Sequence, residues 1–221
     1  GESIGTGALA REVHMLLTRD FDVTSLGVTR HQLLVHPDIP YTSHNSAACL
    51  CIEGGECAAV MEAVRELLLH LFHPGADPGL CVGYLEQFSH YVQDYGARAV
   101  STIVTQREAN SLAKQAGITL LGLGGTNDGI IGALAACGLR ASGQDGRFIS
   151  LPGIRELPQR VTVAEVLRLT PIDEVVDETG SSVDGAVEFQ TLGWVRPDWR
   201  GHRIVLALCE KEGSYVVAGR K

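Results

Sequence analysis

Apolar residues recur at helical spacing in several segments of the chain. Residues 5–20 place Leu9, Val13 and Leu16 on one stripe, and the same spacing continues through residues 56–72 before Pro74 and Gly75 stop it. A period near 3.6 residues is typical of an amphipathic helix. Two further helices are expected after the capping box Thr105-Gln-Arg-Glu108 and over residues 161–169.

Between these helices lie shorter apolar runs that are bounded by turn residues, which is the pattern of strands. The predicted strands are residues 22–37, 45–54, 79–86, 97–105, 117–124, 185–195, 202–210 and 213–221. Helices and strands therefore mix along the chain, and the last three strands follow one another. This order predicts an α+β fold with two closely packed α/β sandwich-type domains.

Composition narrows the class of protein. The 221 residues are 45% hydrophobic and 20% charged, and the net charge is −8. A negative net charge argues against general binding of nucleic acid, which needs a basic surface. The apolar runs are too short or too broken by glycine to cross a bilayer, so no membrane partner is expected. The first residues, GESIGTGALA, show no signal segment, which predicts a cytoplasmic protein.

The six cysteines stand at positions 49, 51, 57, 81, 137 and 209 and form no C-x-x-C pair. Most of them lie in apolar runs, which favours reduced thiols in a core. A metal on Cys49 and Cys51 is the alternative, but further ligands at zinc-like spacing are missing from the sequence. The sequence therefore predicts no zinc site.

The first candidate site is Gly5-Thr6-Gly7, directly before the first helix. The Thr6 hydroxyl could be a plain N-cap. It could also bind a phosphate or accept one, because the two glycines leave its oxygen unshielded.

A second polar cluster lies between the two prolines of "HPDIPY" and an apolar strand. It contains His44, Asn45 and Ser46 among five adjacent polar side chains. Such residues are typical of a connecting turn. A histidine beside an amide and a hydroxyl could instead bind an anion or transfer a proton.

The third cluster is the glycine-rich stretch 122–138, "GLGGTNDGIIGALAACG". Glycines before a helix either allow tight packing or expose backbone N–H groups to a phosphate, here around Gly124, Gly125 and Asn127. Asp128 would repel a bare phosphate, unless Mg²⁺ lies between them. The stretch is not a Walker A motif, since no Gly-Lys-Ser/Thr follows. Upstream, Asp77-Pro78-Gly79 is a turn signature with an available carboxylate.

Taken in order, these clusters resemble the archaeal 2-agmatinylcytidine synthetase (TiaS) family. That family has a Thr before its first helix, a Pro-x-Ile-Pro-Tyr segment, an Asn-Pro-Gly before a strand, and a Gly-Arg-Gly-Leu-Ile-Gly-Ala-Leu-Ala-Ala-Val-Gly segment. Here the matches are Thr6, "PDIPYTSHNSAA", Asp77-Pro78-Gly79 and "NDGIIGALAACG". The resemblance covers residues 1 to about 140 well and the remainder only loosely.

The resemblance implies a TiaS-like kinase domain over residues 1–120, lacking the family's first strand with its Asp-Asp-Thr-Asp motif, and a ferredoxin-like domain over residues 121–221. It also implies ATP and Mg²⁺ as cofactors, a phosphorylated or phosphate-orienting Thr6, and an ATP site at the domain junction. The catalytic residues would be Thr6 and His44. Gly5, Gly7, Asn45, Ser46, Gly124, Gly125 and Asn127 would bind the nucleotide, and Asp128 the metal.

Two basic positions of the family are replaced here, by His44-Asn45-Ser46 and by Asn127-Asp128-Gly129. With the negative net charge, this favours a small-molecule substrate whose carbonyl or amide oxygen is phosphorylated for displacement by an amine. A tRNA substrate with RNA-binding modules from a partner, and a nucleotide-binding regulatory protein without catalysis, are the alternatives. The sequence leaves a homo-oligomer open.

Overall fold

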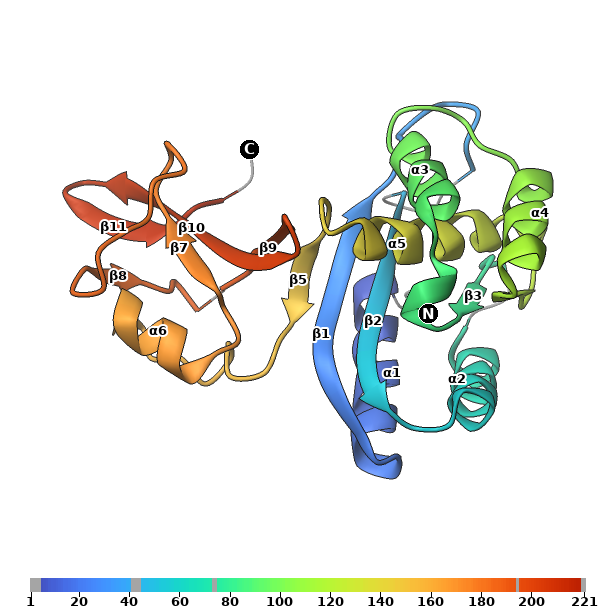
Figure 1. Ribbon diagram of the computed structural model, residues 1–221, viewed down its shortest axis with the longest axis horizontal. Coiled ribbons are helices and arrows are strands. Elements are labelled where there is room, and N and C mark those ends of the chain that lie inside the picture. The colour runs from blue at the N-terminus through green and yellow to red at the C-terminus, as the bar shows by residue number, and fades with distance from the viewer. Residues whose placement is uncertain (1–4, 41–44, 73–74, 194, 220–221) are drawn as a thin grey trace.

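The structure is a computed structural model that describes residues 5–40, 45–72, 75–193 and 195–219. It has two lobes of unequal size that meet at β5 (Figure 1). The larger lobe contains α1 to α5 and β1 to β4, and the smaller lobe contains α6 and the strands after β5. Helices and strands mix in this order, so the predicted α+β class is confirmed.

Apart from α3 and the 3-10 turn η1, the helices begin close to where the sequence predicts them. They are α1 (Thr6–Asp20), α2 (Cys57–Leu71), α3 (His90–Ala99), α4 (Gln106–Ala116), α5 (Gly129–Ser142), α6 (Val163–Leu169) and the 3-10 turn η1 (Leu85–Gln87). The predicted cap of α4 is present, since the Thr105 hydroxyl accepts a hydrogen bond from the Glu108 backbone N–H at 3.3 Å. Gly117, with φ +68°, ends this helix in the left-handed conformation. None of the helices in the described ranges is long and apolar enough to span a membrane.

The strands form one large sheet and one separate pair. They are β1 (Val23–Gln32), β2 (Ser46–Gly54), β3 (Gly79–Val82), β4 (Thr119–Gly122), β5 (Arg147–Ser150), β6 (Arg160–Thr162), β7 (Glu174–Val176), β8 (Glu188–Gln190), β9 (Asp198–Arg200), β10 (Arg203–Lys211) and β11 (Ser214–Val217). The large sheet has the order β2-β1-β5-β9-β10-β11-β8-β6, with β7 paired to β10. β3 pairs with β4 alone, so β2 and β3 each lie at the end of a sheet.

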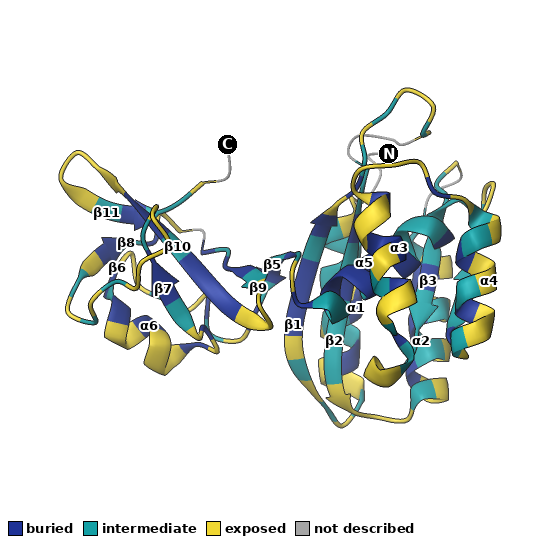
Figure 2. Ribbon diagram, turned by 45° about the horizontal axis from the view of Figure 1, so that its top comes forward, coloured by how far each residue is buried: buried dark blue, intermediate teal, exposed yellow. Residues whose placement is uncertain are grey.

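The strands of the larger lobe separate two apolar layers. Leu50 of β2 and Leu80 of β3 pack with α1 and α2, whereas Cys49 of β2 packs with α3, α4 and α5. The alternation follows from the strand period of two residues. Figure 2 shows buried positions along β1, β3 and α5, with the outer face of α4 exposed.

The predicted strand over residues 97–105 is wrong. Residues 90–99 form α3, and no strand is assigned within 97–105, all of which the structure describes. Val92, Tyr95 and Ala99 are buried at spacings of three and four residues, which is a helical face packed on α5. The β-branched residues from Val100 to Thr105 had favoured a strand, but only Val104 is buried there.

The ferredoxin-like arrangement expected for residues 121–221 is not confirmed. α5 belongs to the core of the larger lobe, where a Cβ on Gly138 would lie 2.4 Å from the carbonyl oxygen of Val92 in α3. In the described part of the smaller lobe, α6 is the one α-helix, whereas a ferredoxin-like unit has two. The boundary after residue 120 stays a prediction.

The two lobes are held together around Arg140, at the C-terminal end of α5. Its guanidinium lies 4.7 Å from the ring centre of Phe148 and 4.3 Å from that of Trp199. The Trp199 indole Nε1 donates a hydrogen bond of 2.8 Å to the Arg140 carbonyl oxygen. A cation between two aromatic faces is favourable when it is desolvated, as Arg140 is with 8% of its surface exposed.

Candidate functional site

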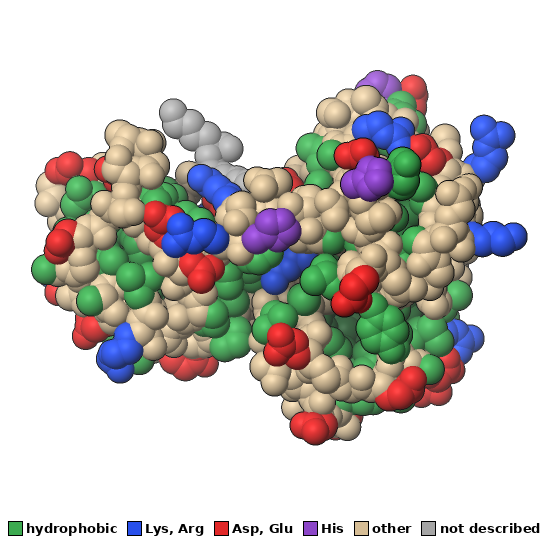
Figure 3. All heavy atoms as spheres, in the orientation of Figure 1, with side chains coloured by type: hydrophobic (Ala, Val, Ile, Leu, Met, Phe, Trp, Pro, Cys, Tyr) green, Lys and Arg blue, Asp and Glu red, His purple; other side chains and the backbone are tan. Residues whose placement is uncertain are grey.

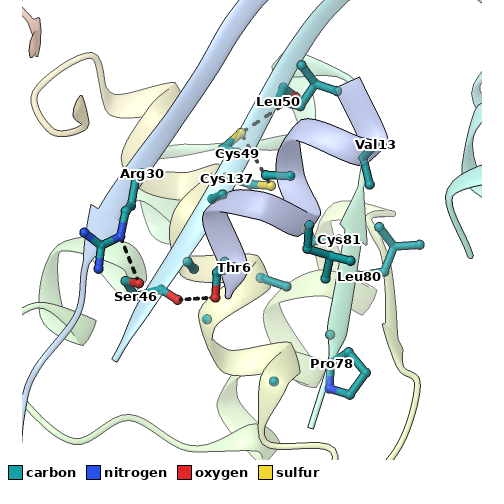
Figure 4. Close-up of a pocket in the computed structure, with 18 of the residues that line it drawn as sticks. Thr6, Val13, Arg30, Ser46, Cys49, Leu50, Pro78, Leu80, Cys81 and Cys137 are labelled. Atoms are coloured by element: carbon teal, nitrogen blue, oxygen red, sulfur yellow. Dashed lines mark hydrogen bonds between the residues drawn. The ribbon is translucent and has the colours of Figure 1, made fainter. Parts of the chain in front are cut away.

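A cavity of about 1420 Å³ lies in the larger lobe, bounded by α1, α2, β2, β3 and α5 (Figure 4). Figure 3 shows hydrophobic side chains around a hollow of this lobe, with carboxylates near its rim. The cavity is lined by several residues that the sequence marks as site residues: Gly5, Thr6, Gly7, Asn45, Ser46, Gly125 and Asp128. Gly124 and Asn127 are outside this lining, and His44 lies outside the described residues.

The N-terminus of α1 opens onto this cavity. Gly5 is the N-cap residue, and no side chain caps the helix. Thr6 is the first helical residue, and its hydroxyl donates a long hydrogen bond of 3.5 Å to the carbonyl oxygen of Ser46 (Figure 4). The N-cap interpretation of Thr6 is therefore wrong. The first turn also has no acidic residue, so the positive end of the helix dipole is open to an anion.

Asn45 and Ser46 lie at the start of β2, where their side chains make hydrogen bonds to neighbouring segments. The Asn45 side-chain amide donates to the Leu34 carbonyl oxygen at 2.7 Å. The Ser46 hydroxyl accepts a bond of 3.1 Å from Nε of Arg30, as Figure 4 shows. Both side chains thus have structural contacts at the place where the sequence predicts nucleotide binding.

Arginines from distant segments meet near this end of the cavity. Arg11 of α1, Arg30 of β1 and Arg196 line the cavity. The pKa of Arg196 is lowered by its burial and by the like charges of the arginines at positions 147, 30, 11 and 155. The sequence alone did not reveal this cluster, because its members are scattered from residue 11 to residue 196. The one local signal was an arginine inside the apolar run of β1.

The N-terminus of α5 is held by a carboxylate from another segment. Asp77 Oδ2 accepts hydrogen bonds of 3.1 Å from the backbone N–H groups of Thr126 and Asp128, and another from the Thr126 hydroxyl. Asp77 thus satisfies these donors although it lies 49 residues from Thr126 in the sequence. An anion at this helix start would have to compete with the Asp77 carboxylate.

Close packing explains several glycines of the stretch 122–138. A Cβ on Gly129 would lie 2.0 Å from the Asp77 carbonyl oxygen, and one on Gly122 would lie 2.1 Å from the Asn127 side chain. Gly125 has φ +65°, in the left-handed region that glycine tolerates best. The packing interpretation of these glycines thus has direct structural support, and phosphate binding by Gly124 and Gly125 stays a prediction.

Asp77 and Asp128 form a pair of carboxylates across the Thr126 hydroxyl. Thr126 Oγ1 contacts Asp77 Oδ2 and lies 2.9 Å from Asp128 Oδ2, but a hydroxyl has one proton and can donate to one of them at a time. Asp77 Oδ1 is buried without a hydrogen-bond partner among the described residues. Oxygen atoms of one or two carboxylates are the protein ligands that Mg²⁺ commonly uses, so the pair fits the predicted metal at Asp128.

Two cysteines of the cavity wall, Cys49 and Cys51, are poor nucleophiles. Cys49 Sγ lies 3.9 Å from Cys137 Sγ, and this contact together with burial raises the pKa of Cys49. The pKa of Cys51 is also raised, chiefly by burial. Because the thiolate is the reactive form, these thiols are suited to a core and not to catalysis.

The fold and the cavity define an α+β protein whose larger lobe carries two helix N-termini at one end of a deep cavity. The same fold occurs in solved structures of TiaS. A complex of TiaS with its tRNA and ATP matches with a TM-score of 0.53 and 21% identity, over 62% of this chain and 33% of the TiaS chain. A complex of TiaS with its tRNA, AMPCPP and agmatine matches with a TM-score of 0.52 and 19% identity, over 75% and 40%.

A third structure, of a tRNA fluorescent labeling enzyme, has a TM-score of 0.51 and 22% identity, over 62% of this chain and 33% of that chain. This chain therefore spans between a third and two fifths of the length of these proteins. No family model and no curated protein matches the sequence. The resemblance that the motifs indicated is confirmed at the level of the fold.

Proposed function

We propose that the chain is a TiaS-like, ATP-dependent enzyme that phosphorylates a carbonyl or amide oxygen of its substrate, for displacement by an amine. One observation carries the proposal. The cavity has an uncapped helix N-terminus with arginines beside it, and a carboxylate pair at the start of α5. Phosphoryl transfer depends mainly on positioning and on neutralising the charge of the phosphates, and such groups are suited to both tasks.

The phosphates would bind at the N-terminus of α1, where the open N–H groups and the charges of Arg11 and Arg30 attract an anion. Asp77 and Asp128 would hold Mg²⁺, which supplies charge neutralisation when it is bound. The Gln106 side-chain amide donates a hydrogen bond of 2.6 Å to Asp128 Oδ1, so the carboxylate is oriented before any ligand binds. Thr6 would carry or orient the transferred group, and His44 would transfer a proton.

The test is the thermal stability of the protein with and without Mg-ATP. A ligand at one hundred times its Kd stabilises the folded state by about 2.7 kcal/mol, which raises the melting temperature. We expect this shift for the wild type and a smaller one for Asp128→Asn. Glu178→Gln, an equal change of charge at an exposed residue of the smaller lobe, is the matched control. A folded wild-type protein without a shift at millimolar Mg-ATP would contradict the nucleotide site.

An RNA substrate is the second candidate, because the arginine cluster gives this acidic chain a local basic surface. TiaS, which shares the fold, is seen in complex with its tRNA. Binding that neutralises phosphates weakens as the salt concentration rises. The logarithm of the binding constant falls linearly with the logarithm of the salt concentration, with a slope of about −0.7 for each phosphate contact to a single strand. We expect Arg30→Ala to reduce this slope for tRNA and Arg107→Ala, on the exposed face of α4, to leave it unchanged. No binding at low salt would exclude tRNA as a substrate of this chain alone.

A further inference from the structure

Three arginines meet on one face of the large sheet. Arg30 of β1 and Arg147 of β5 are direct partners across an antiparallel pair of strands. Arg147 Nε donates a long hydrogen bond of 3.4 Å to the backbone carbonyl oxygen of Arg196, which places the third arginine beside the other two. We call these three residues the arginine corner. Like charges directly opposite each other on two strands destabilise a sheet, so this arrangement costs stability until an anion neutralises it.

The helix α1 lies over the same face of the sheet and brings a fourth arginine to the border of the corner. A Cβ on Gly7 would lie 3.6 Å from the side chain of Ile149, which is two positions from Arg147 along β5. The same Cβ would lie 3.8 Å from Nη1 of Arg11, so the Arg11 guanidinium lies by the first turn of α1. Burial first, and then the like charges of arginines that include these, lower the pKa of Arg196.

The carboxylates of the described chain leave much of this charge in place. Among the described residues, Arg11, Arg30 and Arg147 have no carboxylate oxygen within 4.0 Å, whereas six other arginines have one. Asp198 is the partner of Arg147 in β9, but its Oδ2 accepts a hydrogen bond of 2.7 Å from Arg200. Two members of the corner therefore keep a charge that no described carboxylate neutralises by direct contact.

Several guanidinium donors of the corner are open to a ligand. Arg30 donates from Nε to Ser46 Oγ at 3.1 Å, and its two Nη atoms make no hydrogen bond to a described residue. Arg147 uses Nε and Nη2 in long bonds of 3.4 Å to backbone carbonyl oxygens, which leaves Nη1 without a described partner. The guanidinium group presents its N–H donors in a planar fork that matches the oxygens of a phosphate.

A phosphate group fits this corner better than a carboxylate or a nucleic acid. A carboxylate has a single charge and two oxygens, whereas a phosphate monoester carries about −1.5 to −2 and has three acceptor oxygens for several guanidinium groups. A single strand of nucleic acid binds along an extended basic groove with aromatic side chains. Here the arginines without a carboxylate gather at one corner of a chain whose net charge is −8, which favours a small anion.

We propose that the arginine corner binds the phosphate group of a phosphorylated small molecule, and that this molecule is the acceptor in the reaction. Thr6 and Arg30 both contact Ser46, and Figure 4 shows them on opposite sides of it. A phosphate held by the corner would therefore anchor the rest of the acceptor beside Thr6. Binding energy from such a remote group positions the group that reacts. The role as acceptor rests on the ATP-dependent transfer proposed above, whereas the anion site itself does not.

The first experiment titrates the whole chain with inorganic phosphate in a calorimeter, without ATP or Mg²⁺ and at constant ionic strength. Arg147→Gln and Arg30→Gln are the two test variants, so that one remains if the other does not fold. Arg160→Gln is the matched control, because Arg160 is exposed at the other end of the large sheet and has its own carboxylate, Glu188, at 3.4 Å. We expect each test variant to weaken phosphate binding at least tenfold and the control to keep the Kd within twofold. Equal affinities of the folded proteins, or no binding of millimolar phosphate by the wild type, would overturn the proposal.

The second experiment repeats the titration with a saturating, non-hydrolysable ATP analogue and Mg²⁺. We expect the Kd for phosphate to stay within twofold, because the acceptor and the nucleotide bind together. Loss of phosphate binding would overturn the proposal, since the corner would then be the phosphate site of the nucleotide. A protein that binds phosphate but no nucleotide would contradict the ATP-dependent function and the acceptor role, and it would support the anion site alone. A short single-stranded RNA that binds more than tenfold tighter than phosphate, and loses this affinity in Arg147→Gln, would overturn the small-molecule assignment in favour of RNA.

Discussion

Replacement of Thr6 by alanine separates chemistry from stability at the start of α1. Because Gly5 and not Thr6 is the N-cap residue, the substitution removes no capping bond. It removes one exposed hydrogen bond, to the Ser46 carbonyl oxygen at 3.5 Å, which is at the outer limit of such bonds. The Thr6 hydroxyl therefore contributes little to the stability of the folded state.

The magnitude follows from these contacts. An exposed hydrogen bond of poor geometry contributes less than the usual ~1 kcal/mol, and alanine has a higher helix propensity than threonine by up to about 0.7 kcal/mol. The two effects nearly cancel, so we expect Thr6→Ala to change the free energy of unfolding by less than about 0.5 kcal/mol. A true N-cap threonine would cost about 1 kcal/mol or more.

The assay pairs urea unfolding with ATP turnover for the wild type, Thr6→Ala and Thr6→Ser. If Thr6 carries or orients the phosphoryl group, Thr6→Ala abolishes turnover at nearly unchanged stability, and Thr6→Ser keeps part of it because the hydroxyl remains. Full turnover by a folded Thr6→Ala protein would refute the catalytic role. A loss of stability above about 1 kcal/mol would refute the placement of the N-cap at Gly5.

Three further outcomes test the remaining parts of the structure. Gly129→Ala should destabilise the protein by about 3 kcal/mol in denaturant titrations, because the new Cβ would lie 2.0 Å from the Asp77 carbonyl oxygen. The control is Gly132→Ala in the same helix, where a Cβ would make only ordinary contacts at 3.5 Å, and it should be neutral or stabilising. The N–H groups of Ala59 and Ala58 lower the pKa of Glu56 below its unfolded value near 4.5. The stabilisation that Glu56 gives the folded state is therefore present above that unfolded pKa and is lost as the pH falls. The stability difference between wild type and Glu56→Gln should shrink between about pH 6 and pH 3, and a difference independent of pH would contradict this cap. The purified protein should contain no stoichiometric zinc by elemental analysis, and one tightly held zinc per chain would show that the cysteines were misinterpreted.

Local patterns predicted much of the fold. The stripe of Leu9, Val13 and Leu16 predicted α1, and the Thr105 capping box predicted the start of α4. The sequence did not predict α3, because polar residues around Val92 and Tyr95 obscured its buried face. A periodicity argument fails where only one narrow stripe of a short helix is apolar.

The candidate site was predictable only where its residues are neighbours in the sequence. Gly5, Thr6 and Gly7 could be marked as a group, and they do line the cavity. The contact of Asp77 with Thr126 crosses 49 residues, and the arginine cluster joins α1, β1, β5 and two loops. Such pairings are made by the tertiary fold, and a single sequence has no local signal for them.

The stacked Arg140 makes α5 a mechanical link between the lobes. One end of this helix is fixed to the Asp77 carboxylate through Asp128, and the other is clamped by Trp199 and Phe148 of the neighbouring strands. A helix of this length transmits a push or a rotation with little bending. If the smaller lobe turned relative to the larger one, it would either pull the indole off the guanidinium or carry the start of α5 along. In the second case Asp128, at the start of α5, would shift with the smaller lobe. As long as the Arg140 stacking holds, a change of the angle between the lobes would therefore also change the geometry of the cavity.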